Sequence, residues 1–281
     1  MKVIDNIQRM AMLSKILKKD SKTIGFIPTM GYLHDGHLNL IKTAKQHTDV
    51  AVLSIFVNPK QFSPSEDLDK YPRDLKRDEE MARLAGADVL FNPSIADMYP
   101  EGYATYVDVE RLTNTLCGQA RPGHFKGVAT VVTKLFGIVK PDIAYFGQKD
   151  AQQSIIIKKM AQDLNMDIEI KVLPTVREKD GLAMSSRNIY LSEKERKDAS
   201  CLSQALAKAE TAVKSGERDT SEIIKMMEII IKDRPTAKID YIEAVDAKTL
   251  SPVVTIAGET LIALAVFIGK TRLIDNAILN P

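Results

Sequence analysis

The stretch Pro-Thr-Met-Gly-Tyr-Leu-His-Asp-Gly-His at residues 28–37 constrains the fold of this chain most. It follows a short apolar segment at 23–27, typical of a buried strand, and precedes apolar residues at helical spacing from 38 to 45. A stronger strand pattern follows at 50–57. Strand, turn, helix and strand form a βαβ unit, so we predict a parallel sheet with helices on both faces. Such sheets bind ligands beyond the carboxyl ends of their strands, which is where this turn lies.

The residue types of this turn indicate an anion site. His34 and His37 flank Gly36 at the predicted helix start, where free N–H groups and the helix dipole favour negative charge. Gly31 and Gly36 allow the backbone to approach a ligand closely, and the imidazoles add donors for phosphate oxygens. A histidine near a helix start also serves as an ordinary cap or surface residue, so the spacing alone is a weak signal.

Composition excludes several classes of protein. A chain of 281 residues with 44% hydrophobic and 27% charged residues can form two soluble globular domains. The net charge of +2 gives no broad field for nucleic acid or a membrane surface, so we expect neither as a partner. Cys117 and Cys201 stand without a partner motif or metal-ligand spacing, which fits a reducing compartment. We therefore expect a cytoplasmic protein.

Two loops after the first βαβ unit carry polar side chains suited to a ligand. Asn58 and Gln61 follow the second strand and serve either as loop caps or as ligand contacts. Residues 118–127 combine glycines with Arg121 and His124 before a predicted helix. They predict either a clamp for phosphate or carboxylate, or a solvated basic turn.

The pattern of the first turn recurs further along the chain. A predicted strand at 141–146 is followed directly by Gly-Gln-Lys-Asp at 147–150 and then by a predicted helix. Lys149 is placed as a point charge for phosphate, and Asp150 suits a cap, a ribose hydroxyl or a metal. The run Met-Ser-Ser-Arg at 184–187 offers two hydroxyls and a guanidinium to a triphosphate, although similar composition is common in linkers.

Together these motifs resemble those of the pantothenate synthetase family, the pantoate–β-alanine ligases of the nucleotidylyltransferase superfamily. His-Asp-Gly-His at 34–37 is similar to the superfamily's His-x-Gly-His signature, and residues 184–187 are similar to its Lys-Met-Ser-Lys-Ser loop. One signature follows the first strand and the other follows the last, an order far more specific than either motif alone. The resemblance extends over nearly the whole chain.

The resemblance implies an ATP-dependent ligase that joins pantoate to β-alanine through an enzyme-bound pantoyl adenylate, releasing AMP and pyrophosphate. It places His37 in the family's catalytic position, and we expect His34, Lys149 and Arg187 to neutralise charge beside it. ATP contacts are implied at Met30, Gly31, Tyr32, Leu33, His34, Asp35, Gly36, His37, Gly147, Gln148, Lys149, Asp150, Val176, Met184, Ser185, Ser186 and Arg187.

The resemblance also implies the acid and amine sites. Pantoate contacts are expected at Gln61 and Gln153, and Gln61 also borders the β-alanine site. Mg²⁺ is expected with ATP, and a homodimer is expected from the family. The family's proposed metal carboxylates lie near Asp78, where this chain has Arg77 next door, so the metal ligands stay unassigned. The run Asp-Glu-Glu at 78–80 is better explained as an exposed helical face.

The chain divides into a Rossmann-like nucleotide- and pantoate-binding domain at 1–175 and a smaller α+β domain at 176–281. In the first, apolar spacing predicts a helix over 3–18 and alternation predicts a short strand over 106–109. In the second, a capping box at Ser192 opens a long helix to about residue 214.

Three other functions share parts of this pattern. A nucleotidyltransferase that keeps the nucleotidyl group in its product has the same histidine motif and sheet, but the two glutamines and the loop at 121–127 argue against it. A non-catalytic module would bind ATP without turning it over. A tRNA-charging role is disfavoured because no basic patch or anticodon-binding appendage is visible.

Overall fold

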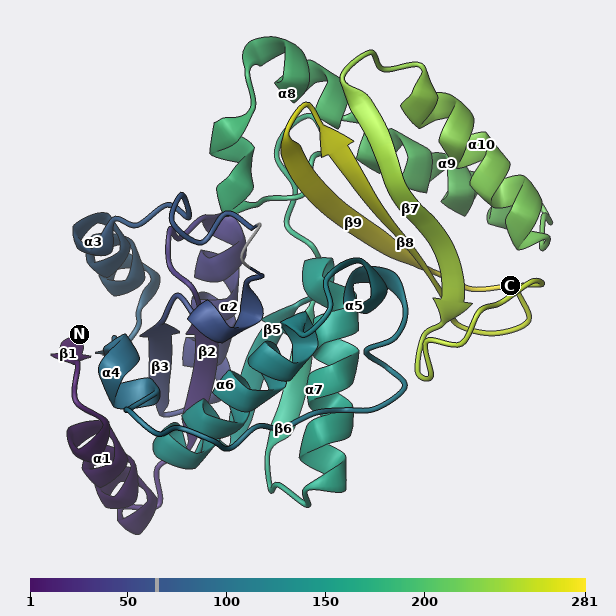
Figure 1. The fold of residues 1–281 in the computed structure, drawn as a ribbon. Helices are drawn as coiled ribbons and strands as arrows, with labels where there is room; N and C mark the ends of the chain where they lie inside the picture. Colours follow the sequence, from purple (N-terminus) through teal and green to yellow (C-terminus); the bar gives the residue numbers. More distant parts are fainter. Residues whose placement is uncertain (64–65) are drawn as a thin grey trace.

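The structure is a computed structural model that describes residues 1–63 and 66–281. These described residues form a six-stranded parallel sheet in the order β1-β4-β3-β2-β5-β6 and a three-stranded antiparallel sheet in the order β7-β8-β9 (Figure 1). The parallel strands are β1 (Lys2–Ile4), β2 (Ile24–Thr29), β3 (Val50–Ile55), β4 (Val89–Phe91), β5 (Ile143–Gly147) and β6 (Glu169–Leu173). The predicted α/β class, with a Rossmann-like sheet and a smaller α+β unit, is confirmed.

Helices cover both faces of the parallel sheet because its strands are apolar on both sides. Phe26 and Val52 pack with α1, α6 and α7, whereas their neighbours Ile27 and Leu53 pack with α2 and α3 on the other face. This alternation follows from the pleat of the strands. The helices of this unit are α1 (Ile7–Lys19), α2 (Asp35–His47), η1 (Pro59–Gln61), α3 (Leu75–Ala85), α4 (Ile95–Met98), α5 (Leu116–Ala120), α6 (His124–Val139), η2 (Gln148–Asp150) and α7 (Ala151–Asp163).

The strand order reverses at β2 and β5, which places a ligand crevice between their carboxyl ends. The ladder between these strands pairs Gly25 with Ile143 and Phe26 with Ala144. Beyond these pairs, the ends of both strands line a cavity. The two turns singled out in the sequence leave the sheet at this point, one from each strand.

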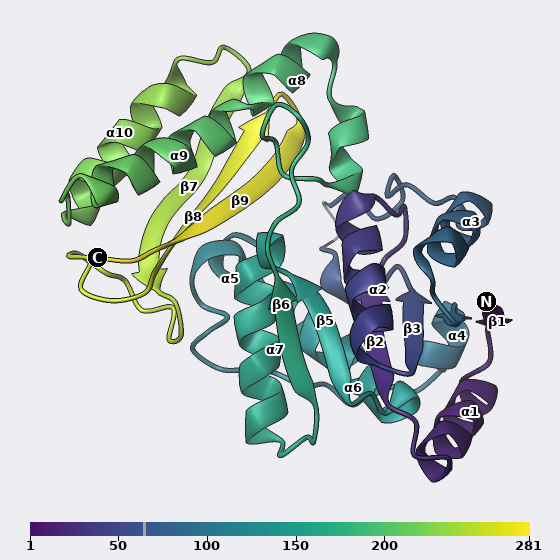
Figure 2. The same cartoon turned by 180° about the vertical axis from the view of Figure 1, so that it is seen from behind.

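The second unit packs two helices on one face of its sheet. Ile262, Leu264 and Val266 on β8 contact α9 and α10, which lie across that face (Figure 2). Leu261 and Ala263 alternate with them and join the hydrophobic cluster of the first unit. The elements are η3 (Ser186–Tyr190), α8 (Glu193–Ala199), α9 (Cys201–Lys214), α10 (Thr220–Lys232), β7 (Ala237–Asp246), β8 (Thr260–Ile268) and β9 (Thr271–Leu279). In the part of the chain that the structure describes, no helix combines the length and apolarity needed to cross a membrane.

Three local predictions differ from the structure. The helix predicted over 3–18 starts later, because the first residues instead form β1 and pair with β4. Residues 106–109 are not a strand, because the N–H of Val107 donates to the hydroxyl of Thr130 on α6 at 2.9 Å. The long helix breaks at Ser200, whose hydroxyl donates to a carbonyl three residues earlier at 2.8 Å.

Candidate active site

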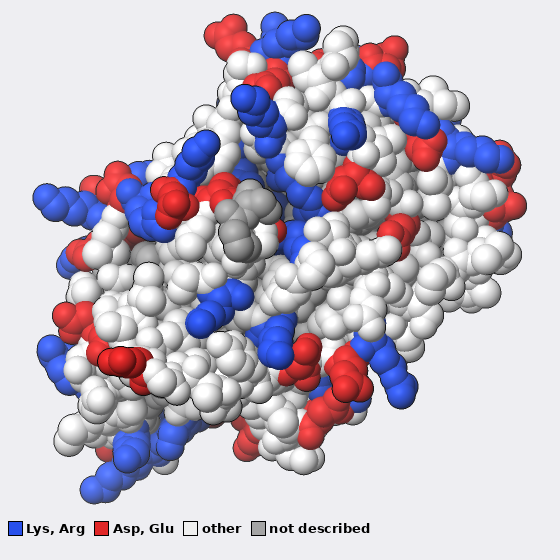
Figure 3. All heavy atoms as spheres, viewed as in Figure 1, with Lys and Arg blue, Asp and Glu red and all other residues white. Residues whose placement is uncertain are grey.

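A cavity of about 890 Å³ lies between the two units, at the carboxyl ends of β2 and β5. Figure 3 shows Lys and Arg atoms in and around the hollow between the units. Because the whole chain carries a net charge of only +2, this positive charge is a local feature. A concave cavity at which polar side chains converge is the expected form of a small-molecule site.

Most of the predicted site residues meet at this cavity. Those in its lining are Met30, His34, Gly36, His37, Gln61, Gly147, Lys149, Asp150, Gln153, Val176, Met184, Ser185, Ser186 and Arg187. Five predicted ATP contacts lie outside this set of described lining residues: Gly31, Tyr32, Leu33, Asp35 and Gln148.

Residues 28–37, which we call the histidine turn, connect β2 to α2. Gly31 and Tyr32 both have left-handed backbones, with φ of 86° and 50°, so the chain reverses sharply before the helix starts. His34 is the N-cap residue of α2, and its ring lies 4.0 Å from that of His37 between centroids. The backbone N–H of His34 donates to Nδ1 of His37 at 3.3 Å. Nε2 of His37 therefore carries the proton of the neutral ring.

Both imidazoles of this turn are neutral near pH 7. Burial, helped by the charge of Lys149, lowers the pKa of His34 to about 4. Burial, together with His34 and Lys149, lowers the pKa of His37 well below its ordinary value. Nδ1 of His34 is buried without a hydrogen-bond partner. The pair therefore offers uncharged polar nitrogens to a ligand at the start of α2.

Residues 147–150, which we call the lysine turn, leave β5 on the other side of the crevice. The Lys149 side chain is mostly buried, and its Nζ lies 3.5 Å from Oδ1 of Asp150. Asn276 on β9 holds this turn from the second unit, because its Nδ2 donates to the carbonyls of Gln148 at 3.0 Å and Lys149 at 2.9 Å. Nε2 of Gln148 donates back to Oδ1 of Asn276 at 3.0 Å. Gln148 therefore serves as a brace for Lys149.

Residues 184–187, which we call the serine–arginine loop, close a third side of the cavity. Arg177 anchors the segment that leads to it, through a bidentate pair at 2.6 and 3.0 Å with Asp275 on β9, whose side chain is fully buried. The N–H of Met184 donates to the carbonyl of Val176 at 3.0 Å. Ser185 accepts from the N–H of Arg187 at 3.3 Å, which starts η3.

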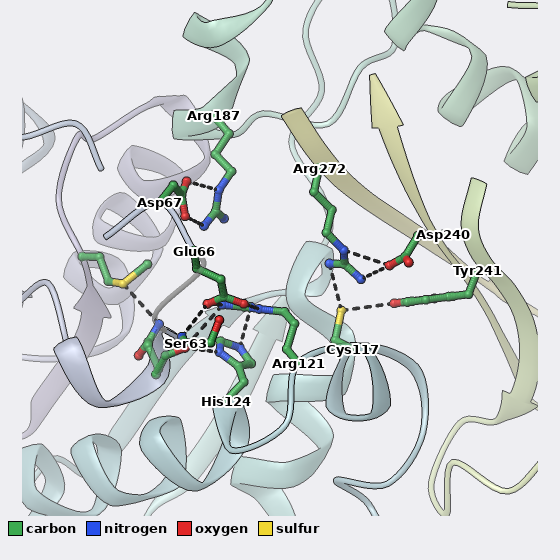
Figure 4. A network of polar contacts seen from close by, with 12 residues as sticks. Ser63, Glu66, Asp67, Cys117, Arg121, His124, Arg187, Asp240, Tyr241 and Arg272 are labelled. Atoms are coloured by element: carbon green, nitrogen blue, oxygen red, sulfur yellow. Dashed lines mark hydrogen bonds and ion pairs between the residues drawn. The ribbon is translucent and has the colours of Figure 1, made fainter. Parts of the chain in front are cut away.

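Two arginines at the cavity are already paired with carboxylates. Arg187 makes a bidentate ion pair with Asp67 at 2.8 and 2.9 Å, and Arg121 makes one with Glu66 at 2.6 and 2.9 Å (Figure 4). Although burial opposes ionisation, hydrogen bonds from these arginines hold the pKa values of both carboxyls below their usual range. The sequence predicts either an anion clamp or a solvated basic turn at residues 118–127, and Arg121 of this loop binds an internal carboxylate.

Gln61 lies on the short helix η1 and is 8% exposed. Its Oε1 accepts from Asn58 at 3.1 Å, and its Nε2 contacts Sδ of Met30 at 3.2 Å. α6 packs closely on this helix at Gly127, where a Cβ would lie 2.2 Å from a backbone oxygen. Asn58 caps η1 by accepting from a backbone N–H at 3.3 Å. Asn58 therefore acts as a loop cap that also orients Gln61.

His124 supports the same helix from α6. Its Nδ1 donates to the carbonyl of Gln61 at 2.8 Å, and its Nε2 accepts from Arg121 at 3.0 Å (Figure 4). Burial, followed by the charge of Arg121, lowers the pKa of His124 to about 4, so this ring stays neutral near pH 7.

The described residues contain no group of three or more His, Cys, Asp or Glu side chains that could hold a metal. Asp78 is 1% exposed, so its explanation as part of an exposed helical face is wrong. Its oxygens accept the N–H groups of Tyr32 and Leu33 at 2.7 Å each. Asp150 differs, since its half-exposed carboxylate stands in the cavity lining beside Lys149.

A second polar cluster joins the two units at the cavity edge. Sγ of Cys117 on α5 lies 3.2 Å from the hydroxyl of Tyr241 on β7, and Arg272 on β9 pairs with Asp240 at 2.8 and 3.0 Å (Figure 4). Arg272 also contacts Sγ of Cys117 at 3.6 Å. The cluster therefore links α5 directly to the second sheet.

Sequence reasoning missed several residues that shape the site. Tyr71 contacts Ser186 at 3.1 Å between hydroxyl oxygens, and Asp275 and Asn276 brace two of the three turns. The resemblance to the family, which extends over nearly the whole chain, is the one signal that covers these residues. Glu66 and Asp67 lie in a charged segment without a motif, so nothing in their spacing predicted the arginine pairs.

Comparison with known proteins agrees over the whole chain. The family model described as pantoate-beta-alanine ligase matches residues 2–278. The chain is 57% identical over 280 residues to the pantothenate synthetase of Pelotomaculum thermopropionicum, covering 100% of this chain and 99% of that protein. It is 55% identical over 280 residues to the pantothenate synthetase of Caldicellulosiruptor bescii, with 100% and 99% covered.

Solved structures show the same similarity. The pantothenate synthetase of Thermus thermophilus aligns with a TM-score of 0.95 at 42% identity, covering 100% of both chains. A pantoate-beta-alanine ligase from Francisella tularensis, complexed with beta-gamma ATP and beta-alanine, aligns with a TM-score of 0.83 at 37% identity and covers 99% of this chain and 97% of that one.

Proposed function

The chain belongs to the pantoate–β-alanine ligase family, and we propose that the cavity between its two units is where this ATP-dependent ligase joins its substrates. The family forms pantothenate from pantoate and β-alanine with ATP. The observation that carries the placement is the convergence of His34, His37 and Lys149 at one cavity between the ends of β2 and β5. The Francisella tularensis complex with beta-gamma ATP and beta-alanine supports both of these small molecules as ligands.

ATP would lie across the crevice between the histidine turn and the lysine turn. The start of α2 and the two neutral imidazoles face its phosphates, and Lys149 supplies the positive charge. The serine–arginine loop adds hydroxyls and Arg187 from the second unit. Gly31, Tyr32, Leu33, Asp35 and Gln148 lie outside the lining, so we assign their contribution to the backbone that shapes these turns.

Pantoate would lie beside ATP at Gln61 and Gln153, which line the same cavity. Amide side chains can bind its hydroxyls and carboxylate without adding charge. Gln61 would also border β-alanine. Since Asn58 and His124 hold Gln61 from two sides, its amide is fixed before a ligand arrives.

In the first step, a carboxylate oxygen of pantoate attacks the α-phosphorus of ATP in line. An O–P bond forms to give pantoyl adenylate, the bond to the β-phosphate oxygen breaks, and pyrophosphate leaves with its electron pair. Both reactants are anions, so the protein contributes mainly charge neutralisation and geometry. His37 and His34 donate hydrogen bonds, and Lys149 and Arg187 stabilise the charge on the phosphates.

In the second step, the amine of β-alanine attacks the acyl carbon of the adenylate. The C–N bond of pantothenate forms, the bond from the acyl carbon to the phosphate oxygen breaks, AMP leaves, and the amine releases a proton. Neither Cys117 nor Cys201 lies in a nucleophile motif, and Ser185 and Ser186 have no base next to them in the sequence, so no covalent enzyme intermediate is required.

Mg²⁺ is proposed as the partner of ATP. Because it prefers oxygen ligands and is often held by one or two carboxylates plus substrate phosphates, Asp150 fits as a ligand. Asp78 does not fit, since both of its oxygens are engaged by backbone N–H groups. Bound Mg²⁺ would neutralise phosphate charge and assist the departure of pyrophosphate.

Three further features are proposed from the family and the composition. We propose a homodimer from the family resemblance, and a cytoplasmic location from two free cysteines, which fit a reducing compartment. We also propose that residues 1–175 and 176–281 are separate domains, which is supported by their different sheets and by a hydrophobic cluster that lies within 176–281 alone.

The test is exchange of labelled pyrophosphate into ATP. ATP, Mg²⁺ and pantoate should support exchange without β-alanine, because the adenylate forms before the amine binds. ATP with β-alanine alone should support none. Exchange that strictly requires β-alanine would exclude this order, and release of ADP with phosphate would indicate an acyl-phosphate ligase. A product that retains the nucleotidyl group would indicate a nucleotidyltransferase, and no exchange under any combination would indicate a binding module.

A further inference from the structure

Asp78 on α3 is a buried carboxylate that contacts the histidine turn from outside the cavity. It is 1% exposed and does not belong to the described residues that line the cavity. Oδ2 accepts the N–H of Tyr32 at 2.7 Å, and Oδ1 accepts the N–H of Leu33 at 2.7 Å. Charge-assisted bonds of this length to consecutive backbone groups are strong and directional.

The backbone of this turn needs such a partner. Gly31 and Tyr32 are consecutive left-handed residues, and a tyrosine with φ of 50° is strained unless its surroundings hold it. Consecutive N–H groups in such turns point the same way and form a concavity that binds an anion. Asp78 fills this concavity so closely that a Cβ on Gly31 would lie 3.0 Å from its Oδ2.

Arg77 completes the contact from the neighbouring position. Its Nη2 donates to the carbonyl of Leu33 at 2.8 Å, and its Nη1 donates to Oδ1 of Asp78 at 3.3 Å. Its guanidinium also lies 4.8 Å from the ring centroid of Tyr32. The start of α3 therefore binds both the N–H and the carbonyl of the residue that precedes His34.

We propose that Asp78 is a positioning residue for ATP, which sets the direction of the histidine turn and thereby of His34, His37 and the start of α2. It acts through the backbone and touches neither substrate nor metal. This inference rests on the proposed placement of ATP at the histidine turn. Three residues separate Leu33 from His37, so a change in the angle of Leu33 is carried directly into the helix start.

The experiment compares D78N with D142N as a matched control. Asp142 also accepts a backbone N–H at an end of β2, that of Ile24 at 2.6 Å, but at the end remote from the cavity. In D78N the amide can accept one of the two N–H groups while its NH₂ opposes the other. In D78N we expect kcat/KM for ATP to fall roughly tenfold to a hundredfold, while the affinity for pantoate stays within about twofold of wild type. The activity of D142N should also stay within about twofold of wild type.

Calorimetric titration with ATP in excess EDTA separates positioning from metal binding. Positioning requires that D78N weakens ATP binding without Mg²⁺ as well as with it. A loss confined to Mg²⁺-containing solutions, or restored by more Mg²⁺, would identify Asp78 as a metal ligand and overturn the proposal. Equal losses for ATP and pantoate would show a merely structural role and would also overturn it.

Two further variants keep the test decisive. If D78N does not fold, R77M retains the carboxylate and should show a smaller loss with the same pattern, ATP affected and pantoate spared. R77M with wild-type ATP kinetics would then contradict the proposal. If H37A abolishes exchange while D78N does not alter it, the positioning role fails and the proposed function stands. If neither variant alters exchange, the proposed placement of ATP at the histidine turn is wrong, and the positioning role that rests on it is wrong as well.

Discussion

The histidine turn and the serine–arginine loop both face the proposed phosphate site, but they are held in opposite ways. The histidine turn is fixed from behind, by Asp78 and Arg77, so its imidazoles keep their cavity side available. In the serine–arginine loop, Arg187 is instead bound within the cavity lining by Asp67, and both side chains are about a quarter exposed.

This difference separates the histidine turn, which we call the prepared half of the site, from the serine–arginine loop, which is the half that exchanges partners. The histidine turn can meet phosphate without giving up a bond, because its supporting anion lies outside the cavity. Nε and Nη2 of Arg187 can meet phosphate only when Asp67 leaves, since both nitrogens already bind its carboxylate. Preorganised donors usually contribute most to rate, so we expect the two halves to respond differently to substitution.

The largest effects should come from the histidine turn and from Lys149 on the lysine turn. H37A and K149A should each lower kcat/KM by roughly 10²–10³-fold, because each removes a donor aimed at phosphate charge in a water-poor site. Initial rates of pyrophosphate release and thermal unfolding curves provide the measurement. The matched controls are H47A, an exposed histidine of the same helix, and K159A, an exposed lysine on α7. Near-normal rates for H37A and K149A with unchanged unfolding would remove this crevice as the active site.

The prepared half is also the half that the sequence predicts best. The βαβ pattern, the left-handed glycine and the two histidines are local in the chain, so strand, turn and helix can be predicted from neighbouring residues. The lysine turn is predicted for the same reason, because Lys149 lies two residues after the end of β5. The position of both turns at one crevice follows from the parallel sheet.

The supporting residues could not be predicted, because they act across long sequence separations. Asp78 looks like one carboxylate in an acidic run, and its burial depends on where α3 packs against α2. Asn276 reaches the lysine turn from a strand more than a hundred residues away. Asp67 carries no motif, and its bond to Arg187 depends on the placement of both units.

A smaller effect should arise at Gln61 and Gln153, the proposed pantoate contacts, which line the same cavity as both halves. We call this part of the cavity the pantoate pocket. Q61A and Q153A should each weaken pantoate binding by about 1–3 kcal/mol while leaving ATP affinity nearly unchanged, because a bound hydroxyl or carboxylate loses its partner. Calorimetric titration with each substrate measures both affinities, with Q162A on the exposed side of α7 as a control. Loss of ATP affinity with retained pantoate affinity in both variants would show that the pocket is misplaced.

The pH dependence of stability should report how tightly the prepared half is packed. The pKa of His34 is lowered from 6.5 to about 4, so between these values the unfolded chain takes up a proton and the native protein does not. The free energy of unfolding should therefore fall as the pH falls below 6.5. The loss should be roughly 1 kcal/mol at about pH 5.5 for each histidine whose pKa is lowered in this way. Urea unfolding of wild type, H34Q and the surface control H47Q checks this. A slope below pH 6.5 that H34Q leaves unchanged would mean that His34 is solvated in the native protein.

The smallest effect concerns the half that exchanges partners, and its sign is the informative part. D67N removes the competing charge from Arg187, so KM for ATP should fall, by up to about fivefold for an ion pair worth no more than roughly 1 kcal/mol. E66Q is the comparison variant, which frees Arg121 in place of Arg187. D163N is the control, which removes an exposed carboxylate paired with Lys159. Steady-state kinetics at two salt concentrations should show the lower KM for ATP in D67N but not in D163N. The fall in KM should be smaller at high salt. A higher KM in D67N would mean that Asp67 helps to form the ATP site, and the serine–arginine loop would then be as prepared as the histidine turn.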